Sequence, residues 1–354
     1  MHRSDAEPFW QQPIEAPFSH WHSEALKRQD LLTKPPGSLG QLEAIACRLS
    51  AQQGRPFPTL SHPWISVFAA DHGIANDGIS LMAREVTAQM INNFLDGGAG
   101  ISVLAAEFGA HLEVIDTGVA TPFPGHPALI RSPIAAGTGN IRHEPAMTGP
   151  QLEQALTIGD EAAGRAHHNG ADLYIAGEMG IGNTSATSAV AAALLGQPAK
   201  TMTGRGSGLD TEGVARKARF LDQALTRHGD DRSPSTVLAS LGGFEIAAMA
   251  GSFIGAARRG IPVLVDGFIA STAVLAAVRM NPSLSPWLHF GHCSGESGHR
   301  LLLEALEATP ILDIGMRLGE GTGAAMAVPV LKAACALHHQ MATFDEAGVA
   351  KNGS

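Results

Sequence analysis

Short runs of β-forming residues alternate with Ala- and Leu-rich stretches along most of this chain, and this alternation restricts its possible folds most strongly. We predict strands within residues 64–73, 111–119, 172–180, 261–267, 287–292 and 310–317. Between them, apolar residues recur at helical spacing, as in 85–98, 149–170 and 243–260. Strands that are apolar on both faces are typical of a parallel sheet covered by helices on each side. The sequence therefore predicts an α/β fold with an open, doubly wound, mostly parallel sheet.

The two ends of the chain have a different character from the middle. Residues 1–60 indicate mainly helix and loop, and the part after Pro310 contains one short strand and a long helix that ends near Gln340. We expect residues 1–60 and 311–354 to pack together as a smaller helical subdomain beside an α/β domain at 61–310. About two domains also agree with a length of 354 residues. The Pro- and Gly-rich segment 123–150 is expected to be an ordered surface excursion.

Charge and cysteine content restrict the partners and the compartment. The chain has 24 Lys and Arg against 33 Asp and Glu, so its formal net charge is −9. Such an acidic chain is a poor candidate for binding nucleic acid or an anionic membrane. Its three cysteines are widely spaced, which favours free thiols. The amino-terminal segment lacks the apolar run of a secretory signal, and the most apolar stretch, 321–337, is shorter than the ~20 residues of a membrane span. We therefore predict a cytoplasmic protein.

Three glycine-rich loops precede predicted helices. The first, Gly180-Ile181-Gly182-Asn183-Thr184, directly follows a strand; the second is Gly204-Arg205-Gly206-Ser207-Gly208, before a helix with Lys217; the third spans 319–323. Glycines let the backbone approach a ligand, and a helix amino terminus offers free N–H groups to an anion. A plain strand-to-helix turn capped by Asn183 or Thr184 is the alternative for the first loop. Three such loops together favour a phosphate-bearing ligand, while the lack of a Walker loop or an intact GxGxxG disfavours nucleoside triphosphates and dinucleotides.

Three glutamates in apolar surroundings are candidates for general acid–base work. Glu178 and Glu320 each lie between glycines and aliphatic residues, and Glu245 lies in an apolar helix. Apolar surroundings favour the neutral carboxyl, which makes the carboxylate a better base near neutral pH. A single Glu is more often a helix cap or an ion-pair partner. Glu320 differs because glycine on both sides is expected to leave its side chain accessible.

Metal binding is not predicted. The pair Asp71-His72 and the histidines His292 and His299 are the nearest candidates for ligands. However, the sequence contains no HExxH motif and no Cys/His cluster with the spacing of a metal site.

Eight segments in order along the chain resemble the nicotinate-nucleotide–dimethylbenzimidazole phosphoribosyltransferase family of cobalamin assembly. They are KPPGSLG at 34–40, ADHGI at 70–74, EVTAQM at 85–90, GEMGIGNT at 177–184, GRGSGL at 204–209, VDGF at 265–268, GHRLL at 298–302 and RLGEGTGA at 317–324. Ala83 replaces the proline that is usual in this family, which leaves the preference among aromatic bases open. Serines at 185 and 207 replace threonines and keep the hydroxyl.

The resemblance implies a Rossmann-like sheet, a homodimer and no cofactor. The implied reaction moves phosphoribose from nicotinate mononucleotide to 5,6-dimethylbenzimidazole. It would give nicotinate and alpha-ribazole 5′-phosphate for the lower ligand of cobalamin. By this resemblance Glu320 is the general base, Glu178 lies beside the ribose, and the loops 180–184 and 204–208 with Lys217 hold the phosphoribosyl group. Ser80, Met82 and Gln89 are implied to line the benzimidazole pocket.

Two other function classes stay open on the residues alone. One is a metal-dependent phosphate-ester hydrolase that uses Asp71, His72 and Asp266. The other is a nucleotide sensor without catalysis, which would not need an accessible Glu320.

Overall fold

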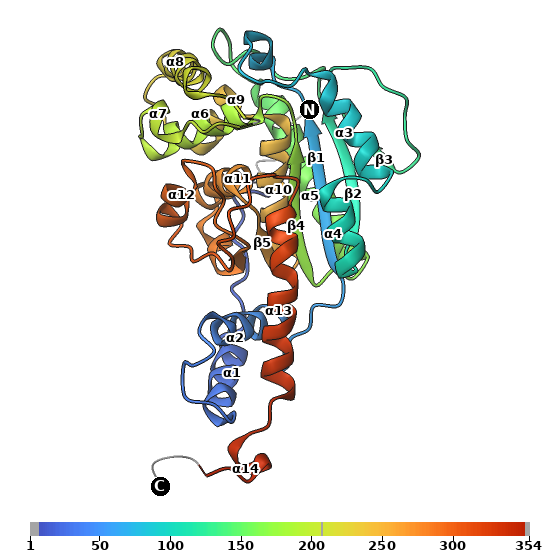
Figure 1. Cartoon of the computed structure of the whole chain (residues 1–354), viewed down its shortest axis with the longest axis vertical. Helices are drawn as coiled ribbons and strands as arrows, with labels where there is room; N and C mark the ends of the chain where they lie inside the picture. Colours follow the sequence, from blue (N-terminus) through green and yellow to red (C-terminus); the bar gives the residue numbers. More distant parts are fainter. Residues whose placement is uncertain (1–6, 207, 351–354) are drawn as a thin grey trace.

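One six-stranded sheet organises the computed structural model, which describes residues 7–206 and 208–350 (Figure 1). The strands are β1 (Pro63–Ala70), β2 (His111–Gly118), β3 (Leu129–Arg131), β4 (Leu173–Met179), β5 (Val263–Val265) and β6 (Leu288–Phe290). Their order is β3-β2-β1-β4-β5-β6, and every neighbouring pair is parallel. The predicted doubly wound parallel α/β fold is confirmed. In this order the direction of winding reverses between β1 and β4, where open α/β sheets bind ligands.

Fourteen helices and two short 3-10 turns, η1 (Gly73–Asp77) and η2 (Pro282–Trp287), connect the strands within the described residues. The helices are α1 (Ser19–Leu31), α2 (Gln41–Gln53), α3 (Glu85–Leu95), α4 (Gly100–Phe108), α5 (Gly149–His168), α6 (Asn183–Leu195), α7 (Ala199–Met202), α8 (Thr211–His228), α9 (Pro234–Leu241), α10 (Phe244–Arg258), α11 (Phe268–Met280), α12 (His299–Ala305), α13 (Thr322–Gln340) and α14 (Phe344–Ala347).

The alternation of side chains along β1 shows how the sheet supports two cores. Trp64 and Phe68 pack into the core that contains α5, α6, α10 and α11. Ile65 and Val67 point to the other face and pack with α2, α3, α4 and α13. Every residue of β1 is buried. Apolar residues on both faces therefore reflect a central strand covered on both sides, as predicted.

One strand was not predicted, and one predicted strand was wrong. The three residues of β3, inside the segment 123–150, pair with β2 at the edge of the sheet, where no strand was predicted. Conversely, 310–317 forms no strand: Leu312 makes an isolated bridge with His292, just beyond the end of β6. Gly315 follows with a φ of +76°, a left-handed conformation outside the range of a regular strand. Both segments are short, so a few backbone hydrogen bonds decide whether each one pairs as a strand.

Helix α13 runs along one face of the sheet and continues to α1 and α2 (Figure 1). Its first half packs in the core on one face of the sheet. At its last turn, the carbonyl of His338 accepts a hydrogen bond from Arg28 (2.6 Å) and its ring bonds to Gln29 (2.8 Å), both on α1. Helices α1 and α13, from the two end regions of the chain, therefore pack together. The boundaries at 60 and 310 stay a prediction, because α13 contacts both the core on the sheet and α1. No helix of the described residues is both long and apolar enough to span a membrane.

Candidate active site

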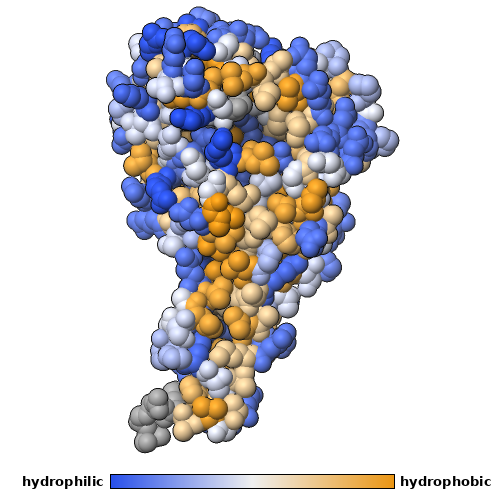
Figure 2. All heavy atoms as spheres, viewed as in Figure 1, coloured by the Kyte–Doolittle hydropathy of each residue, from blue (hydrophilic) through white to orange (hydrophobic). Residues whose placement is uncertain are grey.

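A cavity of about 400 Å³ lies at the carboxyl ends of the strands, next to the reversal between β1 and β4. Figure 2 shows the surface hollowed in this region, where hydrophilic and hydrophobic residues meet. We define as the apolar wall the lining residues Met82, Val86, Met90, Met179 and Leu318. We define as the polar wall the lining residues Thr184, Gly206, Glu296 and Arg317. The carboxylates Glu178 and Glu320 line the same cavity.

Glu178 is a buried acid held by neighbouring donors. It lies on β4, opposite Phe68 of β1. The side-chain amide of Asn183 donates to its Oε2, and the backbone N–H of Glu320 donates to its carboxyl group as well. Burial raises the pKa of Glu178 to about 8, and the nearby charges of Glu245 and Asp266 add to this shift. At neutral pH Glu178 is therefore mostly protonated in the ligand-free protein.

Glu320 approaches the cavity from an unusual backbone conformation. Its φ is +64°, between Gly319 at +88° and Gly321 at +87°. A left-handed conformation is rare for a side chain larger than glycine, and such residues cluster at functional sites. The Oε2 atom accepts a hydrogen bond from the backbone N–H of Ile101, in the first turn of α4 (3.2 Å). Burial raises the pKa of Glu320, whereas this bond opposes the shift.

The expectation that the flanking glycines leave Glu320 accessible was wrong. Only 6% of the residue is exposed, although its side chain lines the cavity. The glycines instead permit a backbone turn in which three successive residues have positive φ. A Cβ at Gly319 would also collide with Oε1 of Glu178, so this glycine lets the two carboxylate-bearing segments approach closely.

The first glycine loop, 180–184, does not behave as a simple capped turn. The N-cap of α6 is Gly182, with a φ of +100° and no side-chain cap. Asn183 directs its amide to Glu178 instead, and the hydroxyl of Thr184 accepts a hydrogen bond from Nζ of Lys217 (2.8 Å). Gly180 lines the cavity, whereas Gly182 is packed against His72 behind it. Both candidate capping side chains are therefore directed to site residues.

The second loop contributes less of its length to the cavity than expected. Gly206 lines it, but Gly204, Arg205 and Gly208 do not, and Ser207 lies outside the described residues. Lys217, only 1% exposed, reaches the loop from α8. Burial lowers the pKa of Lys217 to about 8, and the charge of Glu296 acts against this shift.

The predicted benzimidazole residues are not all at the cavity. Met82 lines it, whereas Gln89 points outward from α3 and is exposed. Ser80 is not among the lining residues, and its hydroxyl accepts the backbone N–H of Met82 (3.1 Å). The apolar wall includes Val86 and Met90, which the sequence reasoning missed. Their separation of four residues places both on one face of α3, and that periodicity could have revealed them.

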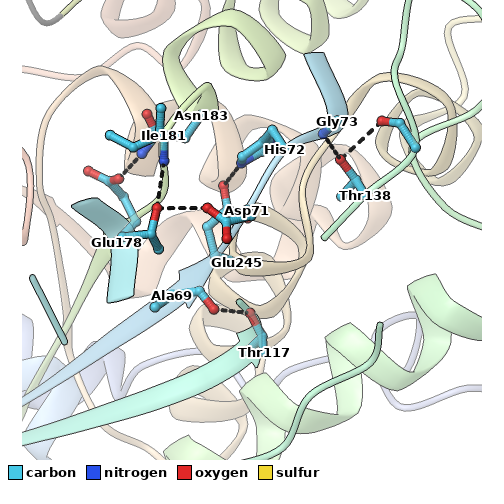
Figure 3. A network of polar contacts seen from close by, with 12 residues as sticks. Ala69, Asp71, His72, Gly73, Thr117, Thr138, Glu178, Ile181, Asn183 and Glu245 are labelled. Atoms are coloured by element: carbon cyan, nitrogen blue, oxygen red, sulfur yellow. Dashed lines mark hydrogen bonds and ion pairs between the residues drawn. The ribbon is translucent and has the colours of Figure 1, made fainter. Parts of the chain in front are cut away.

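Asp71, His72 and Asp266 have separate partners in the described structure. The carboxylate of Asp71 accepts hydrogen bonds from the Thr87 hydroxyl (2.7 Å) and a backbone N–H. His72 pairs with buried Glu245 at 2.6 Å between Nε2 and Oε1 (Figure 3). Asp266 accepts the backbone N–H of residue 324 at the start of α13 (2.8 Å). Within the described ranges, no three His, Cys, Asp or Glu side chains gather as a metal site would require.

Comparison with known proteins identifies the family. Residues 14–349 match the protein family described as Phosphoribosyltransferase. A relative from Pseudomonas fluorescens Pf-5, named nicotinate-nucleotide–dimethylbenzimidazole phosphoribosyltransferase, is 52% identical over 97% of this chain and 98% of its own length. A relative of the same name from Azotobacter vinelandii is 53% identical over 93% of this chain and 94% of its own. The chain belongs to this phosphoribosyltransferase family.

A solved structure agrees with this assignment. The crystal structure of CobT from Thermus thermophilus has a TM-score of 0.91 and 45% identity, and the match covers 94% of this chain and 100% of that one. The protein is therefore an enzyme, a pentosyltransferase, with the fold of its solved relatives.

In this phosphoribosyltransferase, sequence reasoning missed two charged residues of the polar wall. Glu296 follows the strand β6, and Arg317 directly precedes the third glycine loop. Arg317 donates from Nη1 to the carbonyl of Gly206 (3.4 Å), which joins the second and third loops. Both residues lie within or beside segments that carried the family resemblance, and that position was the available signal.

Proposed function

We propose that this enzyme transfers phosphoribose from nicotinate mononucleotide to 5,6-dimethylbenzimidazole. Nicotinate and alpha-ribazole 5′-phosphate, used for the lower ligand of cobalamin, are the products. The observation that carries the proposal is one cavity with an apolar wall, a polar wall and two buried carboxylates. The names of the relatives support the same substrates.

The reaction needs one base and two well-placed rings. The benzimidazole nitrogen attacks C1′ as the bond from C1′ to the nicotinate nitrogen breaks. Because the departing ring is a pyridinium, it needs no acid catalyst. The other benzimidazole nitrogen loses its proton, and Glu320 accepts it. Attack opposite the departing ring converts the β-glycosidic bond to an α bond in a single displacement, and holding both rings in reach of each other supplies much of the rate.

The surroundings of Glu320 support its role as the base. A buried carboxylate with a raised pKa accepts a proton more readily than an ordinary exposed glutamate. The bond from the Ile101 N–H fixes Oε2, so the second carboxylate oxygen stays available for the proton. The amino terminus of α4 also favours the anionic form in the resting enzyme.

Glu178 has a different role in this proposal. With a pKa of about 8, it enters the cycle mostly protonated. The positive pyridinium ring of nicotinate mononucleotide favours the ionised form of any nearby carboxyl group. Glu178 then stabilises the positive charge that develops at C1′ as the bond to nicotinate breaks.

The two walls divide the substrates between them. The polar wall, with Lys217 behind Thr184, takes the 5′-phosphate and ribose through backbone N–H groups and one buried cation. The methionines of the apolar wall take the benzimidazole ring, because thioethers pack favourably against aromatic faces. We include a cytoplasmic homodimer without a cofactor in the proposal. The exposed apolar side chains of Phe18, Leu26 and Leu31 support self-association.

Release of nicotinate tests the proposal directly. Purified enzyme is mixed with nicotinate mononucleotide and 5,6-dimethylbenzimidazole, and nicotinate and the α-riboside product are measured by chromatography. We expect equal amounts of both, with turnover that survives exhaustive EDTA treatment. Activity that returns only with an added divalent cation would instead support the hydrolase, and binding without product would support a sensor.

A further inference from the structure

An acidic side chain lies where a phosphate group is expected. Glu296, in the segment between β6 and α12, lines the cavity as part of the polar wall. Its carboxylate is attracted by Lys217 and Arg317, and it accepts a hydrogen bond from the backbone N–H of Gly206. Burial raises the pKa of Glu296, and these three partners oppose that shift.

The surrounding backbone holds Glu296 in this position. Its N–H donates to the hydroxyl of Ser294 (3.3 Å), and its carbonyl accepts the N–H of His299 (3.2 Å). At Gly204 a Cβ would collide with Oε2 of Glu296. A glycine in the second loop therefore provides the space that the carboxylate occupies.

The partners of Glu296 are those that bind phosphate in proteins. A phosphate monoester is bound by cations and by backbone N–H groups of glycine-rich loops. Lys217 contacts the hydroxyl of Thr184, and an added Cβ at Gly206 would lie 3.1 Å from that hydroxyl and 3.6 Å from Nζ of Lys217. The loops, the cation and the carboxylate thus share one small region of the cavity.

We propose that Glu296 is an internal anion that holds the phosphate subsite in the ligand-free enzyme and competes with the substrate phosphate for it. The inference rests on the proposed function, in which the polar wall binds the 5′-phosphate. Like charges repel each other, so a free inorganic anion gains little by entering beside Glu296. A mononucleotide displaces the carboxylate because its nicotinate ring and ribose bind elsewhere in the cavity at the same time. Glu296 therefore weakens the binding of every phosphate-bearing ligand, and a ligand with further contacts in the cavity compensates for this loss.

Glu296→Gln tests this role because it removes the charge and keeps the shape. Calorimetry at pH 7 would measure binding of inorganic phosphate, nicotinate mononucleotide and nicotinate riboside. At this pH Lys217 is mostly protonated. His299 is neutral, because burial lowers its pKa to about 4. We expect the first two ligands to bind about 3–10-fold more tightly, as for loss of one partly screened charge, and the riboside to bind as before. Inorganic phosphate should also inhibit turnover at a correspondingly lower concentration.

Glu304→Gln, an exposed change on α12, is the matched control and should leave all three affinities unchanged. Glu296→Ala should act in the same direction as Glu296→Gln. Weaker or unaltered phosphate binding in both Glu296 variants would overturn the inference. A change in the affinity for the riboside would also overturn it, because that result would place Glu296 at the ribose. Wild-type enzyme that releases no nicotinate would instead contradict the proposed function.

Discussion

The two walls of the cavity are built in different ways. The polar wall is held by hydrogen bonds: Lys217, behind it, donates to the Thr184 hydroxyl, and Arg317 donates to the carbonyl of Gly206. The apolar wall consists mainly of methionines, and two of its members, Met82 and Leu318, are 49% and 61% exposed. Fixed bonds preorganise a site for one ligand shape, whereas unbranched methionine side chains adapt to several.

This difference indicates which wall should accept only one kind of ligand and which should accept several related ligands. In the proposed reaction the phosphoribosyl group carries the same charges in every turnover. A rigid polar wall can therefore orient this group without having to adapt to other ligands. In the proposed reaction the apolar wall contacts the aromatic base by packing, so related rings of similar size should be accepted. Substitutions in one wall should therefore alter one substrate and leave the other unaffected.

We expect the largest effect on the reaction rate at Glu320, which lines the cavity beside the two walls. Glu320→Gln keeps the size of the side chain and removes the proton acceptor. Loss of a general base costs about 10²–10⁴ in rate, so kcat should fall by that factor while both substrates still bind. Steady-state kinetics with binding measurements would separate the two effects.

A matched substrate sharpens this test. An N-alkylated benzimidazole attacks without giving up a proton, so Glu320→Gln should reduce its turnover by a smaller factor. Near-normal turnover of dimethylbenzimidazole by the variant would move the search for the base to Glu178.

The polar wall should respond next most strongly. Lys217→Ala removes a buried cation and should weaken binding of nicotinate mononucleotide by roughly 10–100-fold, the usual range for a charged hydrogen bond. Binding of dimethylbenzimidazole should stay unchanged, and so should both affinities in Lys200→Ala, an exposed change on α7. Calorimetry on each substrate alone provides the comparison. An equal loss of affinity for both substrates would contradict the assignment of one substrate to each wall.

The apolar wall should give the opposite pattern with a smaller effect. Met179→Ala removes apolar contact from the base and should raise the KM for dimethylbenzimidazole about 5–10-fold, as expected for loss of part of one apolar side chain. The KM for nicotinate mononucleotide should not change. Val103→Ala, at an exposed position of α4, is the control. A shared increase in both KM values would mean that the walls are not independent.

The smallest expected effect concerns stability and pH at Glu178. The raised pKa means that the folded protein keeps a proton at Glu178 that the unfolded chain loses above pH 4.5. Stability from this group is therefore full below pH 4.5 and falls as the pH rises toward about 8. Glu178→Gln removes this loss, so its Tm should exceed that of the wild type by a few degrees at pH 8 and differ little at pH 5.

Thermal unfolding of both proteins at the two pH values measures the difference. Glu153→Gln, exposed on α5, should show no such pH dependence relative to the wild type. A constant difference between Glu178→Gln and the wild type from pH 5 to 8 would show that Glu178 does not titrate in this range.

Local patterns in the sequence determined the fold class and the place of the site. Long apolar runs predicted β1, β2 and β4, because a buried strand needs apolar residues on both faces. The first glycine loop, directly after β4, indicated with the two others a phosphate-bearing ligand, and the cavity lies at this end of β4. The order of the motifs identified the family, which the comparisons confirm.

Only the tertiary structure decided the state of the site residues. The sequence shows glycines beside Glu320, but its burial depends on α4 and its Ile101 N–H, more than two hundred residues away in the chain. The contact of Lys217 with Thr184 and the placement of Glu296 beside the second loop likewise join distant segments. Protonation and exposure depend on which atoms surround a group in space, and that neighbourhood exists only after the segments have packed together.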